Sequence, residues 1–329
     1  MRNISKILLL LILSLSFSLI SSAFAADKPT KVDLQHLSFD EALKNFGLMT
    51  DIYSTGDATI LCTPIGDNTG VSQATGGAIP RDVTKIVETS LNNIGGHVTL
   101  ATYDPALIQN LTVTGFSEFA NKRIPDVFLK GGITMVGFDA KKPDSITVTM
   151  DFFLSDFKTL VALPNIQTFN TVKMNSKKSA ETISIELSGV NLEIEGQIRT
   201  LEGKHGAIRP VVQASMIELL GRYLVIPYWR VLPGAHEDSY VIETLKKNYK
   251  NSNTTQKILF AQEQLFLHGY DVAFSGALDK RTMAAFKKFK SSINTEEEAL
   301  AVGVITKLYL TVPLTDKAYE RREVMDSKQ

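Results

Sequence analysis

The sequence predicts an α/β (α+β) assembly domain with a mixed sheet, followed by a small all-α domain. In residues 146–152, apolar side chains alternate with polar ones, which is the period of a strand with one buried face. In residues 83–94, apolar side chains instead recur at the spacing of an amphipathic helix. Helical spacing resumes near residue 255 and continues to about residue 314, which predicts the second domain.

Composition excludes several classes of protein. The chain has 329 residues, of which 35 are Lys or Arg and 35 are Asp or Glu, so its formal net charge is zero. Its length suits about two domains. The balanced charge argues against a general nucleic-acid binder, which normally carries a basic excess. The single cysteine excludes an internal disulfide framework and any zinc or iron–sulfur site built from several cysteines.

Residues 1–25 are predicted to be a secretory signal peptide. Arg2 and Lys6 precede an apolar run at residues 7–20, and the small residues of a cleavage site follow, with the cut between Ala25 and Ala26. The alternative is a membrane anchor, but the run is short for a span, which needs about 20 residues. No later stretch has transmembrane length without charges. We therefore expect a periplasmic protein, associated with the outer membrane or the cell wall.

The remaining chain divides by composition into five parts. Residues 26–55 are expected to form an N-terminal extension with a helix start at Ser38, and residues 56–234 the α/β domain. The polar residues 235–254 are expected to be a linker, residues 255–314 the small helical domain, and residues 315–329 a charged, helical or frayed tail. Strands are predicted in residues 58–63, 97–100, 126–137, 146–152, 183–187 and 192–194.

Residues 210–226 are predicted to form a helix with little polar face. Such a helix is either deeply buried or shared with a partner. The aromatic residues that follow it are common interface anchors, although core packing is an equal alternative for them. The candidates for an oligomer or partner interface are Val211, Met216, Leu220, Tyr228 and Trp229.

The segment Gln256–Leu314 resembles the small three-helix peptidoglycan-binding module of envelope hydrolases and adaptors. The resemblance rests on Gln264-Leu265, Gly269-Tyr270, Gly276, Thr282, Ala285-Phe286 and Phe289. It departs from the family at Ser275-Gly276, where Asp-Gly is frequent, and at Asp279-Lys280, where Gly-Pro is frequent. The resemblance implies a three-helix fold that binds peptidoglycan. The candidate binding residues are Tyr270, Ser275, Asp279, Arg281, Thr282 and Lys287.

Two other readings of this segment stay open. The same three-helix bundle can serve protein contact instead of glycan binding. The basic residues of the predicted helix after Asp279 can meet acidic peptidoglycan carboxylates, or they can simply form a solvated helix face.

The segment from about Gly56 to Leu232 resembles the curli secretion channel (CsgG) and holdfast-anchor family. The resemblance is carried by residues 65–70 after the first strand, by the helix at 83–91, by the strand at 126–133 and by the apolar helix at 210–220. It implies a periplasmic α/β domain that assembles into rings. A pore is not implied, because residues 138–145 form only a tight turn and residues 171–202 carry many charges.

The sequence offers no recognisable catalytic or metal site, so we expect neither a catalytic residue nor a metal or other cofactor. Its five histidines form no metal-binding motif, and no phosphate-binding loop or nucleophile elbow is present. Cys62 lies in an apolar strand, where a buried structural thiol is expected. Asp67 lies in a turn sequence that Asp and Asn favour anyway.

The two resemblances behind one signal peptide imply a non-catalytic, homo- or hetero-oligomeric scaffold subunit of an envelope-spanning secretion or surface-appendage complex, including an outer-membrane core complex. Its expected partners are peptidoglycan and other envelope proteins, and not nucleic acid. One alternative is a cell-wall hydrolase that the C-terminal module targets to its substrate. A second alternative is a subunit of an outer-membrane secretion channel.

Overall fold

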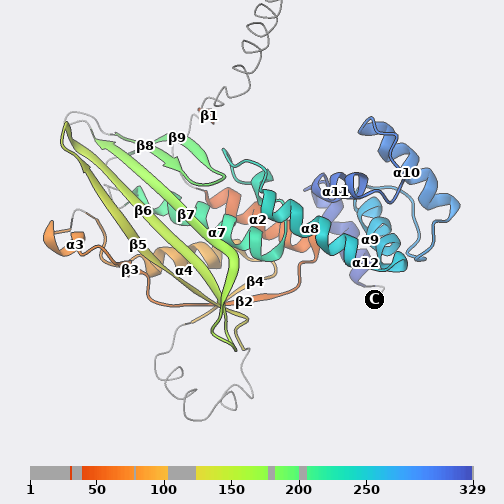
Figure 1. Ribbon diagram of the computed structural model, residues 1–329, viewed down its shortest axis with the longest axis horizontal. Coiled ribbons are helices and arrows are strands. Elements are labelled where there is room, and N and C mark those ends of the chain that lie inside the picture. Colours follow the sequence, from red (N-terminus) through yellow and green to blue (C-terminus); the bar gives the residue numbers. More distant parts are fainter. Residues whose placement is uncertain are drawn as a thin grey trace, which may run out of the picture. The chain divides into compact units, whose positions relative to one another are not determined.

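The computed structural model describes residues 30–31, 39–77, 79–102, 124–176, 182–199 and 206–327 (Figure 1). The predicted signal peptide, with its cleavage site between Ala25 and Ala26, lies outside these residues. Residues 31–329 form one compact unit. No helix in the described residues combines the length and the apolar character that crossing a membrane requires.

A mixed sheet forms the centre of the α/β part, as the alternating patterns predict. Its strands lie in the order β9-β8-β7-β6-β5-β2-β4, and β3 pairs beside β5. The pairs β2–β4, β2–β5 and β3–β5 are parallel, whereas β5 to β9 form an antiparallel meander (Figure 1). The strands are β1 (Thr30–Lys31), β2 (Ala58–Cys62), β3 (Gly66–Asp67), β4 (Val98–Ala101), β5 (Val127–Asp139), β6 (Lys142–Asp156), β7 (Ala162–Ser176), β8 (Thr182–Ser188) and β9 (Glu193–Arg199).

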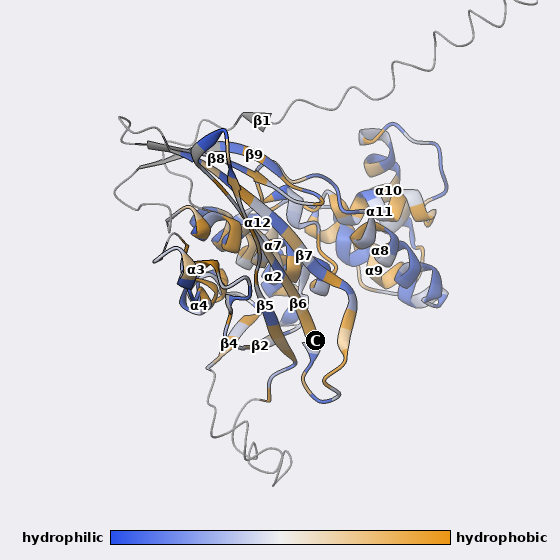
Figure 2. Cartoon of the chain, turned by 60° about the vertical axis from the view of Figure 1, so that its left-hand side comes forward, coloured by the Kyte–Doolittle hydropathy of each residue, from blue (hydrophilic) through white to orange (hydrophobic). Residues whose placement is uncertain are grey.

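The long strands bury one face and leave the other accessible, because successive side chains point to opposite sides of a strand. On β6, Val148, Met150 and Phe152 are fully buried, whereas Asp151 and Phe153 between and beside them are only partly buried. On β7, hydrophilic and hydrophobic residues follow one another along the strand (Figure 2). We call the accessible side of β5, β6 and β7 the outer face.

Helices α4 (Thr84–Ile94) and α7 (Ile208–Leu224) cover the buried face of the sheet, and α2 (Asp40–Tyr53) packs on these two helices. Helix α7 contacts β6 and β7 on one side and α2 and α4 on the other. This position explains why α7 is apolar almost all round, since every residue from Pro210 to Arg222 is buried. The short helix α3 (Val71–Ala74) lies in the loop after β3, and the 3₁₀ helix η3 (Tyr228–Arg230) follows α7.

The C-terminal residues form a helical part with a core of its own. Its helices are α8 (Ser239–Asn251), α9 (Thr254–Leu267), α10 (Lys280–Ser292), α11 (Val302–Leu310) and α12 (Asp316–Asp326). Helices α9, α10 and α11 pack around Leu265, Phe286, Phe289, Ile305 and Leu308. The fold class is therefore the α/β (α+β) part with a mixed sheet and the all-α part that the sequence predicts.

The structure differs from the predicted N-terminal extension at residues 39–55. Helix α2 lies in this range, and its residues Leu43, Phe46, Met49 and Ile52 are fully buried in the main core. Leu43, Phe46, Thr50 and Tyr53 follow the i, i+3, i+7, i+10 spacing of one helix face, and Met49 and Ile52 widen the buried side, so the segment is a core element of the α/β part.

The predicted linker at 235–254 is also different, since most of it is helix α8. Asp238 accepts a hydrogen bond from Tyr240 N and caps this helix, and Asn253 begins α9 directly afterwards with a capping box. Val241, Leu245 and Tyr249 form a buried stripe at i, i+4 and i+8 beneath the lysines. The lysine-rich composition therefore reflects only the exposed side of an amphipathic helix.

The C-terminal tail is a packed helix and joins the two parts. Helix α12 contacts both α2 and α9, with Ala318 and Met325 buried. Tyr309 of α11 adds a second junction, because its ring packs edge-on against Tyr53 of α2 with 4.7 Å between centroids. The Tyr53 hydroxyl donates to the Tyr309 carbonyl at 2.8 Å. These contacts explain why the helical part and the α/β part form one compact unit.

Candidate functional site

The loop between α9 and α10 is held by Gln262, a residue that no sequence motif marks. Its side chain is fully buried, and its Oε1 accepts a hydrogen bond from Gly276 N at 3.0 Å. Its Nε2 lies 3.1 Å from Ser275 Oγ, 2.9 Å from the Ala277 carbonyl and 3.0 Å from Thr282 Oγ1. The one available signal was a glutamine directly after Ala261, inside the apolar stripe of a predicted helix.

Asp279 caps α10 and completes this network. Its Oδ1 accepts from Thr282 N at 2.8 Å, and its Oδ2 accepts from Ser275 Oγ at 3.1 Å. The hydrogen bonds from Thr282 and Ser275 favour the charged carboxylate and lower the pKa of Asp279. The structure thus brings together Ser275, Asp279 and Thr282, three of the six predicted peptidoglycan-binding residues. In this arrangement their polar atoms form hydrogen bonds within the loop network.

The other three predicted binding residues lie apart from that network. Tyr270 is partly buried, and its ring centroid lies 6.4 Å from that of His268. Arg281 is exposed, with its Nη1 atom 3.8 Å from Asp271 Oδ1. Lys287 is exposed farther along α10.

Lys287 lines a groove of about 1000 Å³ between α10 and residues 294–300, which we call the α10 groove. Apolar walls come from Leu278, Met283 and Leu300, and Met283 is 46% exposed. Lys287 and Lys290 contribute two ammonium groups, and Glu296 and Glu298 line the opposite rim. The groove thus offers apolar surface beside two ammonium groups on one side and two carboxylates on the other, which suits a ligand with apolar faces and charged groups.

The predicted interface residues on α7, and Tyr228 of η3, lie inside the chain's own core. Val211, Met216 and Tyr228 are 0% exposed, and Leu220 is 1% exposed. They contact the sheet and the helices around α7, so in this fold they present no surface to a partner. Trp229 is partly buried and packs edge-on against Tyr228, with 5.5 Å between the ring centroids.

The chemistry of Cys62 agrees with the buried thiol that the sequence predicts. The side chain is 1% exposed in β2, and burial raises the pKa of its thiol to about 12, with the Glu88 and Asp82 carboxylates adding to the effect. A thiol with that pKa is protonated at neutral pH and is a poor nucleophile. Among the described residues, no three His, Cys, Asp or Glu side chains gather where they could hold a metal ion.

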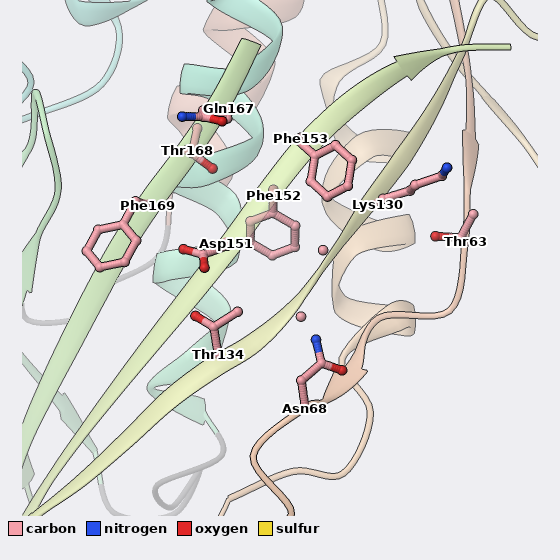
Figure 3. A pocket seen from close by; sticks show the side chains of 12 residues that line it. Thr63, Asn68, Lys130, Thr134, Asp151, Phe152, Phe153, Gln167, Thr168 and Phe169 are labelled. Atoms are coloured by element: carbon pink, nitrogen blue, oxygen red, sulfur yellow. The ribbon is translucent and has the colours of Figure 1, made fainter. Parts of the chain in front are cut away.

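A second hollow lies on the outer face of the sheet, with a volume of about 650 Å³ (Figure 3). Strands β5, β6 and β7 line it together with Thr63 and Asn68, which follow β2 and β3. Asp151 and Phe153 of β6 and Phe169 of β7 lie in it. We call this hollow the sheet pocket. No sequence motif marks Asp151, Phe153 or Phe169; the one signal in the sequence is a charged residue within the apolar-polar alternation of β6.

Comparison with known proteins leaves the family of this chain open. No family model matches the chain, and no curated protein matches it. Among solved structures, the chain is similar to a dodecamer of a PelC point variant from Paraburkholderia phytofirmans, with a TM-score of 0.26 and 10% sequence identity over 50% of this chain and 90% of that chain. A likeness at that TM-score supports no inference about function.

Proposed function

We propose that this protein is a non-catalytic scaffold subunit of an envelope-spanning complex, and that its helical part holds the complex to peptidoglycan. The observation that carries the proposal is the α10 groove, where exposed Met283 lies beside the ammonium groups of Lys287 and Lys290. The α/β part serves as the assembly platform, in line with its resemblance to ring-forming envelope proteins.

The groove matches the chemistry of a peptidoglycan strand. Sugar rings present apolar C–H faces that pack on side chains such as Met283 and Leu278, and the stem peptides carry carboxylates that accept hydrogen bonds from lysine. Lys287 and Lys290 are three residues apart, so they lie on one side of α10. Neither lysine forms an ion pair with a described residue, although the carboxylates of Glu296 and Glu298 line the same groove.

The firm attachment of the helical part supports an anchoring role. Arg322 of α12 donates from Nε to the Ile52 carbonyl of α2 at 2.8 Å and from Nη2 to Glu263 of α9 at 2.6 Å. A force on the helical part therefore reaches the main core without passing through a flexible linker. If several copies assemble, weak contacts with one sacculus add up to a long residence time.

Co-sedimentation with insoluble peptidoglycan tests the proposal. We expect the purified protein to sediment with the sacculi and the double variant Lys287→Ala/Lys290→Ala to stay largely in the supernatant. The matched control is Lys280→Ala/Lys288→Ala, which removes the same charge from exposed positions on the same helix outside the groove. It should sediment like the parent protein.

Two results would contradict the proposal. Equal losses of co-sedimentation in both double variants would show a general charge effect that does not depend on the groove. A parent protein that does not sediment with the sacculi would show that the proposed contact with peptidoglycan is absent. Clearing in a peptidoglycan zymogram, with or without added zinc, would instead favour the cell-wall hydrolase. A pull-down from crosslinked envelopes that recovers no larger complex would contradict the scaffold role.

A further inference from the structure

The lining of the sheet pocket includes Asp151, and one of its carboxylate oxygens lacks a hydrogen-bond partner. Oδ1 of Asp151 is buried and has no hydrogen-bond partner, and no salt bridge from a described residue reaches this carboxylate. Such a group is unfavourable in a folded chain, because it has given up water without gaining a replacement. The Oδ1 atom itself is enclosed by the chain, whereas the Asp151 side chain as a whole is partly exposed and lines a pocket of about 650 Å³, so a cation bound in the pocket would be attracted by a carboxylate that no described residue neutralises.

Two aromatic side chains flank this carboxylate on the outer face. Asp151 is paired directly with Phe169 of β7, and Phe153 is two residues farther along β6, so all three side chains project to the same side of the sheet. Phe169 is 52% exposed. Figure 3 shows the rings of Phe153 and Phe169 on either side of Asp151. Aromatic faces attract organic cations, so the walls and the carboxylate favour the same kind of ligand.

The strand on the other side of Asp151 brings the Asn68 side chain close to the pocket. The partner of Asp151 on β5 is Gly132, which has no side chain. A Cβ atom at Gly132 would lie 2.3 Å from Asn68 Nδ2, so only glycine lets the loop after β3 approach the strand here. Asn68 closes the pocket from this side and offers polar atoms to a bound backbone (Figure 3).

Among the described residues, Lys130 is the cation that lines the pocket, yet it forms no salt bridge with Asp151. Its Nζ atom lies over the ring of Phe128, 5.5 Å from the centroid. In Figure 3 its side chain points away from Asp151 and toward Thr63. The carboxylate is therefore left to a cation from another molecule.

The geometry favours an organic cation over a metal ion. Calcium and magnesium require several oxygen ligands, and the described residues hold no group of three His, Cys, Asp or Glu that could supply them. The aliphatic stem of lysine or arginine, by contrast, packs well between aromatic rings while its charged end reaches a carboxylate. The volume also accepts neighbouring backbone in addition to one side chain.

We propose that the sheet pocket binds a lysine or arginine side chain of a partner polypeptide, with the cationic group on Asp151 and the stem between Phe153 and Phe169. The site lies on strands of the α/β part and shares no residue with the α10 groove. A test of the sheet pocket is therefore independent of the proposed contact with peptidoglycan.

Titration of the purified full-length protein with acetyl-Gly-Lys-Gly-amide and acetyl-Gly-Arg-Gly-amide, followed by NMR amide shifts, tests this site. We expect saturable shifts in β6 and β7. The isosteric peptide with norleucine in place of lysine should bind at least about tenfold more weakly, since it lacks the charge-assisted hydrogen bond. Added salt should weaken the lysine and arginine peptides and leave the norleucine peptide unchanged.

Four variants sharpen the test. Asp151→Asn should weaken the lysine peptide at least about tenfold, and Phe169→Ala should weaken it while keeping the charge. Lys130→Met should strengthen binding, because it removes a like charge from the pocket wall. The matched control Asp139→Asn removes a carboxylate at the end of β5 outside the pocket and should leave binding unchanged.

Several outcomes would overturn the proposal. Equal binding of the norleucine peptide would show a purely apolar groove, and unchanged binding by Asp151→Asn would exclude the carboxylate. Butylammonium that binds as tightly as the lysine peptide would identify a small-amine site instead of a polypeptide site. Thermal melting of each variant checks its fold; if Asp151→Asn is unfolded, unchanged affinity in both Phe169→Ala and Lys130→Met would still reject the site.

Discussion

Nη2 of Arg322 in the last helix donates a hydrogen bond to Oε1 of Glu263 in α9 at 2.6 Å, while Nε of the same guanidinium donates to the Ile52 carbonyl of α2 at 2.8 Å. The arginine is 4% exposed. One planar side chain therefore connects the first helix of the main core, a helix of the bundle and the C-terminal helix.

Arg322→Met should lower the free energy of unfolding by about 3 kcal/mol, because it leaves a buried carbonyl and a half-buried carboxylate without their donor. Urea unfolding followed by circular dichroism measures the change. Lys317→Met is the matched control, since it removes an exposed charge from the same helix and should change stability by less than about 0.5 kcal/mol. A loss of similar size in the control would contradict the bridging role of Arg322.

Gln262→Leu should loosen the loop before α10 without unfolding the bundle. The leucine fills much of the same space but removes the acceptor of Gly276 N and the donor to three loop oxygens. We expect hydrogen exchange at the Gly276 amide to accelerate and stability to fall by about 1–3 kcal/mol. Unchanged protection of that amide would show that Gln262 does not hold the loop.

The buried Glu218 should make stability depend on pH in a defined direction. Desolvation raises its pKa above the usual value, against the opposing effects of Arg222 and Asn170. At a pH between the pKa of Glu218 in the unfolded chain and its higher pKa in the folded chain, the native state binds more protons. The contribution of Glu218 to stability is therefore fully present below the unfolded pKa and is lost as the pH rises through the folded pKa.

Glu218→Gln should remove this contribution. Compared with the parent protein, the variant should gain stability progressively as pH rises from about 4 to 8, measured by urea unfolding at each pH. Glu237→Gln serves as the control, because Glu237 is exposed. The stability of this variant should change with pH in the same way as that of the parent protein. A constant difference between Glu218→Gln and the parent over the whole range would refute a raised pKa.

Cys62 should resist modification in the folded protein. With a thiol pKa of about 12 and 1% exposure, it should react with iodoacetamide at pH 8 at least about a hundredfold more slowly than in urea-unfolded protein. Mass spectrometry of quenched samples follows the reaction. Rapid labelling under native conditions would show that β2 opens readily.

Local sequence patterns predicted much of the fold, because they report on elements whose burial follows a simple period. The alternation in residues 146–152 became β6, and the helical spacing of residues 83–94 became α4. The helices after Asn253 were also predictable, since Asn253 and Asp279 cap α9 and α10 with their own side chains. In each case the decisive interactions lie within one or two turns of the chain.

Elements defined by distant contacts were not predictable in the same way. Residues 246–253 look like a linker by composition, yet Leu245 and Tyr249 bury the underside of α8. The apolar surface of α7 indicated burial but not its partner; only the packed sheet shows that Val211 and Met216 face the chain's own core. Composition does not distinguish a buried helix from an interface helix, because both remove the same side chains from water.

The sequence by itself determined the alternating strands, the capped helices, the buried chemistry of Cys62 and the basic character of α10. Only the tertiary structure decided that Ser275, Asp279 and Thr282 join one loop network around Gln262, and that Lys287 and Lys290 lie instead in a groove. It alone also placed Asp151 between Phe153 and Phe169 opposite Gly132. The physical reason is that periodicity fixes which face a side chain takes, whereas its neighbours on that face come from strands and loops far away in the chain.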